Sequence, residues 1–152
     1  MASFGGLAAP SDPPVRVNDE TTSLYSLGFG ADLRLGVQIS EWFSLDLQAF
    51  AETALLAGDA RIGGLVEFAP SEFFAFALGG GVGSMFIANF FAAAPTADFA
   101  SGVLRLEGRV PQGGGPDPVF GIEGQLCDTF AGDFPPGTLL LGGRAFGGVL
   151  WH

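Results

Sequence analysis

The sequence predicts an all-β protein, an antiparallel up-and-down barrel of about eight strands, and three observations support this fold class. Apolar residues alternate with small or polar ones through most of residues 24–151, which is the period of a β-strand. Helical spacing is scarce, and short turns separate the alternating segments, so consecutive strands should pair as antiparallel neighbours. A chain of 152 residues suits one domain and is too short for two independent cores.

The first clear strand is LYSLGFGADLRLGVQIS, residues 24–40. Every second residue from Tyr25 to Ile39 is apolar, whereas the intervening row holds Ser, Gly and Gln with Asp32 and Arg34. Turn and loop residues such as SEW, PQGGGPDP and DTFAGDFPPG separate the later segments. The later strands are expected at residues 43–55, 60–68, 74–83, 100–110, 119–127 and 138–151.

The two ends of the chain carry weaker patterns. Residues 1–23 suggest a weak first strand, ASFGGLAA, and a loop, and counting that strand gives eight in a single domain of residues 1–152. In the last segment, 138–151, the alternation is blurred and does not orient the strand. Residues 1–10 lack the basic start and apolar stretch of a secretory signal, so an exported protein would be a mature or truncated form.

Composition excludes several classes. The chain is 48% hydrophobic and 14% charged, with a net charge of -10, six arginines and no lysine. A nucleic-acid binder needs a basic face, so that class is not expected. Lysine keeps solvent-facing strands soluble, and its absence suggests that few strand faces meet bulk water. The single Cys127 excludes an internal disulfide framework, and no window is apolar enough for a transmembrane helix.

The polar row of the strands indicates the environment of the barrel. In a soluble barrel this row of Gly, Ala, Ser and scattered charges would face water, which is a poor surface for solvent-facing strands. In an outer-membrane barrel the apolar row faces lipid, and the small and charged residues fill a narrow interior. The sequence therefore favours a transmembrane β-barrel.

Charged residues of the polar row are predicted to form an ion-pair network inside the barrel. Buried charges are tolerated when they are paired, and the arginine fork can hold two carboxylate oxygens. Arg144, in the last strand, is included although that strand is not oriented. The predicted network comprises Asp32, Arg34, Asp46, Glu52, Asp59, Arg61, Glu67, Arg105, Glu107, Arg109, Glu123 and Arg144.

Aromatic residues gather near the predicted strand ends, as the girdles of membrane barrels do at the two interfaces. The predicted interfacial aromatics are Tyr25, Trp42, Phe43, Phe68, Phe74, Phe86, Phe99, Phe120 and Trp151.

The repeated unit of strand, short turn with Pro or Ser and an aromatic, then strand occurs in ISEWFSLDLQAF and EFAPSEFFAFAL. In this respect the chain, over residues 22–151, resembles the small eight-stranded outer-membrane barrels of Gram-negative bacteria, of the OmpX and OmpA membrane-domain type. The resemblance implies an outer-membrane location, contact with lipid and lipopolysaccharide, and insertion by the barrel-insertion machinery. Such barrels usually end on an aromatic residue, whereas here Trp151 is penultimate.

Catalytic chemistry has little support. The single histidine is His152, so no base stands beside a nucleophile in the strands, and GFGADLRLG and GGGVGS lack the spacing and the helix of a dinucleotide motif. We expect no catalytic residues, no metal and no cofactor. The expected function is a non-enzymatic, monomeric membrane protein with a structural or surface-interaction role. The alternatives are a porin-like transport protein or fragment of a larger barrel, and a soluble lipocalin-like barrel that binds a ligand.

Overall fold

A computed structural model describes residues 2–3, 15–17, 20–22, 28–54, 57–87, 95–113 and 115–150, with the backbone alone before residue 30 and at residues 54 and 87. Within these ranges, no helix has the length and hydropathy needed to cross a membrane.

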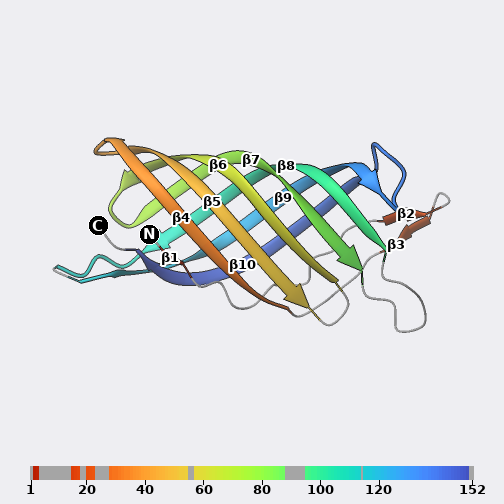
Figure 1. The fold of residues 1–152 in the computed structure, drawn as a ribbon. Helices are drawn as coiled ribbons and strands as arrows, with labels where there is room; N and C mark the ends of the chain where they lie inside the picture. Colours follow the sequence, from red (N-terminus) through yellow and green to blue (C-terminus); the bar gives the residue numbers. More distant parts are fainter. Residues whose placement is uncertain are drawn as a thin grey trace.

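Seven long strands form one antiparallel sheet that curls around a common axis (Figure 1). Each strand pairs with its neighbours in the sequence, so the order along the sheet is up and down. The all-β class and the meander that the sequence predicts are therefore confirmed. The strands are β4 (Gly28–Ser40), β5 (Phe43–Ala54), β6 (Ala57–Ser71), β7 (Phe74–Ile87), β8 (Thr96–Arg109), β9 (Asp117–Gly132) and β10 (Leu139–Leu150).

Three short strands precede the sheet. β1 (Ala2–Ser3) lies between the two edges of the sheet, with Ala2 opposite Val149 of β10 and opposite Leu33 of β4. β2 (Val15–Val17) and β3 (Glu20–Thr22) pair with each other. Among the described residues β4 and β10 do not pair directly, so the sheet itself has seven strands. Of the predicted weak first strand, ASFGGLAA, Ala2 and Ser3 form β1, and the rest lies outside the described residues.

The turns of the sheet differ between its two ends. We call one the short-turn end, because Glu41–Trp42 and Glu72–Phe73 there each join two strands, with residues 110–116 as the third connection. The opposite end carries the 133–138 loop. That loop begins after Gly132, which has a φ of 108° and whose added Cβ would overlap the Thr96 carbonyl oxygen, so only glycine fits.

Several strands extend further than the sequence indicates. Residues 57–59, between the strands expected at 43–55 and 60–68, belong to β6, since Ala57 and Gly58 pair with β7, and β9 continues past Cys127 to Gly132. The reason is that backbone pairing continues through polar residues at strand ends, where the apolar alternation has already stopped. β6 also reaches Ser71 through an irregularity in its pairing with β7.

The two faces of the sheet have opposite polarity. Among the described residues 23 large hydrophobic side chains are exposed, most of them on the outer face, including Leu35, Ile62 and Leu104. In the described ranges the inner face carries ten buried polar or charged residues. β10 follows the same alternation, with Leu140 buried between the exposed Leu139 and Leu141, which orients the strand that the sequence did not.

Small apolar clusters complete the interior. Phe99, Cys127 and Leu140 pack together towards the end opposite the short turns, and Leu65, Ala77 and Val103 form a second cluster. β7 contributes mostly glycine and alanine to this face, as the sequence indicated. A Cβ on Gly79 would lie 2.6 Å from Leu65 Cδ2 and overlap the Gly64 carbonyl oxygen, so the interior has no room for it.

Candidate functional site

The interior charges come from strands that lie on opposite sides of the curled sheet. Alternation directs the same row of each strand inward, and the curl brings β4 against β8 and β10. The structure brings ten of the twelve predicted network residues into direct ion pairs. These ion pairs form two groups, and Arg105 contacts residues of both.

The first group lies towards the short-turn end. Arg34 contacts Glu67 at 3.2 Å and Glu107 at 3.3 Å, and its Nη1 lies 3.8 Å from Asp46 Oδ2. Arg109 contacts the same two glutamates, Glu67 at 2.6 Å and Glu107 at 2.9 Å. Two arginines thus share two carboxylates, which offsets the cost of burying all four charges.

The second group lies around Asp32 and Glu123. Arg105 reaches Asp32 at 2.5 Å and Glu123 at 3.4 Å. Arg144 contacts the same pair, at 3.5 Å and 2.9 Å, and Arg61 contacts Glu123 at 2.7 Å. Arg105 also contacts Glu107 at 3.3 Å, which links this group to the first. The ion pairs therefore form one continuous network across the interior.

Glu52 and Asp59 lie outside these ion pairs, although the sequence predicted them in the network. They face each other across β5 and β6, near the ends of the strands opposite the short turns, and both are partly exposed. Access to water at this position removes the need for a direct charge partner.

Four residues in the interior were not predicted as part of the site. Gln48 donates to both carboxylate oxygens of Asp32 at 3.0 Å, and Arg61 donates to the Gln125 side-chain oxygen. The guanidinium of Arg144 lies 3.5 Å from the ring centre of Phe50, and that of Arg105 lies 3.6 Å from Phe146. Their position in the inward row is the signal that could have identified them.

Most predicted aromatics lie on the outer face near the strand ends. At the short-turn end the Phe68 ring centre lies 5.3 Å from those of Trp42 and Phe43 and stacks on Phe76. Phe74 and Phe120 are exposed at the same end, and Phe86 is exposed at the other. Tyr25 and Trp151 lie outside the described residues.

Phe99, which the sequence predicts as an interfacial aromatic, lies in the interior. Phe99 is fully buried, because it shares the inward row of β8 with Val103 and Arg105. An irregularity in the β8–β9 pairing occurs between Asp98 and Phe99. Clustering near a strand end therefore did not identify the face on which this ring lies.

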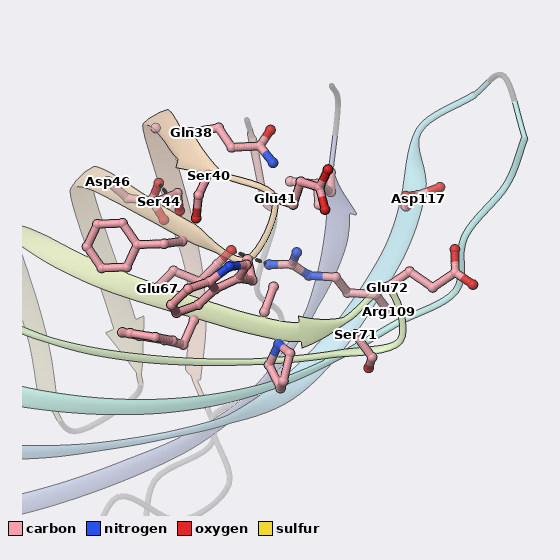
Figure 2. Close-up of a pocket in the computed structure, with 17 residues that line it drawn as sticks. Gln38, Ser40, Glu41, Ser44, Asp46, Glu67, Ser71, Glu72, Arg109 and Asp117 are labelled. Atoms are coloured by element: carbon pink, nitrogen blue, oxygen red, sulfur yellow. Dashed lines mark hydrogen bonds and ion pairs between the residues drawn. The ribbon is translucent and has the colours of Figure 1, made fainter.

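A cavity of about 810 Å³ opens at the short-turn end (Figure 2). Asp46, Glu67 and Arg109 of the ion-pair network line it from within. Glu41 and Glu72 in the two tight turns also line it, and Trp42 and Phe68 form part of its wall. The cavity is thus where the buried network meets solvent.

The described residues contain no group of three His, Cys, Asp or Glu side chains placed to hold a metal ion. The paired charges join strands that lie on opposite sides of the curled sheet. No family model, curated protein or solved structure matches this chain. The functional argument therefore rests on the polarity of the two faces and on the cavity.

Proposed function

We propose that the chain is an outer-membrane β-barrel with a side-chain-filled interior and a structural or surface-interaction role without enzymatic activity. One observation carries this proposal: the protein is apolar outside and charged inside. Large hydrophobic side chains are exposed on the outer face of all seven long strands, whereas Asp32, Arg34 and Arg105 are almost completely buried.

The outer face is suited to lipid and poorly suited to water. Exposed apolar patches on soluble monomers rarely exceed a few hundred Å², and here apolar side chains continue from strand to strand around the sheet. In a bilayer these side chains stay in an apolar environment, and the polar row is sheltered in the interior. The inverted polarity thus favours lipid as the solvent of the outer face.

Strand lengths are consistent with a membrane span. A tilted strand needs roughly 9–11 residues to cross the hydrocarbon, and the seven long strands have 12 to 16. The exposed Trp42, Phe74 and Phe120 lie near one end of the strands, where an interfacial girdle would be. Lipid and lipopolysaccharide are the partners that this surface would contact, and the barrel-insertion machinery would assemble it.

Closure of the barrel is part of the proposal. Unpaired backbone groups at a sheet edge are costly in lipid, so β4 and β10 need a partner. β1 already pairs with both edges through Ala2, which suggests that the N-terminal segment supplies the eighth strand. An eight-stranded barrel encloses side chains and no wide channel, as in the OmpX type.

The test is refolding of the purified chain in detergent, followed by circular dichroism, gel mobility before and after heating, and flotation with lipid vesicles. We expect a β-sheet signal, a heat-dependent mobility shift and co-flotation. A monodisperse protein in buffer without detergent, with no affinity for vesicles, would contradict the proposal and favour the soluble lipocalin-like barrel.

A second candidate is a porin-like transport protein or part of a larger barrel. It is favoured by the edges β4 and β10, which are joined only through the two residues of β1 in the described part of the chain. Planar-bilayer recording separates the two functions: steady single-channel conductance supports transport, and silence with correctly inserted protein supports the filled barrel.

A further inference from the structure

The cavity at the short-turn end has an excess of negative charge. Arg109 is the only cation among the described residues that line it, and its charge is already shared with Glu67 and Glu107. A positively charged guest would therefore be favoured over an anion. The lining carboxylates are Glu41, Asp46, Glu67, Glu72 and Asp117.

Asp46, which forms a long ion pair with Arg34, offers an acceptor atom that has no hydrogen-bond donor among the described residues. Its side chain is 2% exposed, and its Oδ1 accepts a hydrogen bond from Ser44 at 3.3 Å. Its Oδ2 has no hydrogen-bond donor among the described residues, and the Arg34 Nη1 atom at 3.8 Å is beyond hydrogen-bond distance. Ser40 also lines the cavity. Its hydroxyl oxygen is buried and has no hydrogen-bond partner among the described residues. Buried polar atoms in native proteins are usually satisfied, so these two suit a polar guest.

The wall of the cavity adds aromatic surface. Trp42 and Phe68 lie with their ring centres 5.3 Å apart at an angle of 45°. Aromatic faces attract ammonium groups and also pack against alkyl chains. This wall favours an organic cation over a small hydrated ion.

A bare metal ion fits less well. No three carboxylate, thiol or imidazole side chains among the described residues are grouped to hold one. Calcium and magnesium ions take six or more oxygen ligands, whereas an ammonium needs only a few acceptors.

We propose that the cavity at the short-turn end is a binding site for a small organic cation that carries a primary ammonium. The ammonium donates to Asp46 Oδ2, the Ser40 hydroxyl is a further polar group of the lining, and the carbon chain lies against Trp42 and Phe68. This site is additional to the membrane function proposed above, because its acceptor Asp46 belongs to the inner face, although Trp42 is also one of the exposed aromatics at this end.

The experiment is isothermal titration calorimetry of the refolded full chain with 1,4-diaminobutane. Succinate and 1,4-butanediol, which have similar carbon chains, serve as anionic and uncharged controls. We expect the diamine alone to bind. The Asp46→Asn variant keeps the shape and removes the charge, and we expect its affinity to be about tenfold lower or worse.

Two further variants distinguish a loss of diamine binding from a loss of folding. Gln38→Trp fills the cavity from its wall without touching an ion pair, and we expect it to lose diamine binding too. Asp98→Asn removes a carboxylate near the opposite end, where Asp98 accepts a bond from Ser84 at 2.5 Å, and we expect unchanged affinity. The proposal is overturned if the wild-type chain does not bind the diamine, if the diol binds equally well, or if Gln38→Trp keeps wild-type affinity. The β-sheet signal and gel shift of each variant report separately on the fold.

Discussion

Arg105 Nη1 lies 2.5 Å from Asp32 Oδ2, although the two residues stand 73 positions apart, on β8 and β4. Both side chains are 1% exposed. The same guanidinium contacts Glu107 and Glu123 and covers the ring of Phe146. Arg105 therefore holds together both groups of the interior network.

Removing Arg105 should be among the most destabilising single changes. Arg105→Met leaves Asp32, Glu107 and Glu123 short of one positive charge in a buried site, and we expect a loss of about 3–5 kcal/mol of unfolding free energy. Urea unfolding in detergent micelles measures it. Arg105→Lys keeps the charge and loses the guanidinium fork, so its unfolding free energy should lie between those of the unsubstituted chain and Arg105→Met. A loss below about 1 kcal/mol for Arg105→Met would show that the network contributes little net stability.

The glycine face of β7 should reject even one added methyl group. In Gly79→Ala the new Cβ would meet Leu65 and the Gly64 carbonyl, and we expect a cost of about 1–3 kcal/mol. Gly102 on the adjacent strand is the matched control, because a Cβ there has nothing within 4 Å. Gly102→Ala should leave the urea midpoint nearly unchanged. Equal effects of the two substitutions would argue against a tightly filled interior.

A charge on the outer face should be costly at mid-strand and tolerated near an end. Leu104 is 49% exposed near the middle of β8, and Leu104→Arg should cost about 2–4 kcal/mol in lipid vesicles. Val110, just beyond the end of β8, is 47% exposed, and Val110→Arg should cost about 0–1 kcal/mol. Reversible unfolding in vesicles gives both values. A soluble barrel would instead tolerate both arginines, since each would lie in water.

Two phenylalanines should behave differently when they are truncated. Phe99 is fully buried against Cys127 and Leu140, so Phe99→Ala should cost about 3–5 kcal/mol through a cavity. Phe120 is 59% exposed on the outer face, and Phe120→Ala should have a clearly smaller effect. Urea unfolding of the two variants under the same detergent conditions makes the comparison. Similar losses would contradict the inward placement of Phe99.

The sequence could largely predict which side chains point into the interior, but not which of them contact one another. Alternation assigned Asp32, Arg61 and Glu123 to the inward row, because successive side chains of a strand point to opposite faces. The partner of each arginine depends on how far the sheet curls, and local sequence contains no measure of this. Gln48 is an example. Alternation places it in the inward row, whereas its two hydrogen bonds to Asp32 follow from the register of β4 and β5. The cavity is lined by residues from or next to three connections at one end of the sheet. Their proximity depends on the curl of the whole sheet, which local sequence does not contain.

The sequence by itself determined the class of the fold, the order of the strands and the polarity of the two faces, since all three follow from short turns and a period of two. Only the tertiary structure decided the direction of Phe99, the orientation of β10 and the pairing of Arg105 with Asp32. The physical reason is distance. Strand direction is set by neighbouring residues along the chain, whereas side chains that meet across the interior are brought together by the accumulated twist and curl of strands that lie between them.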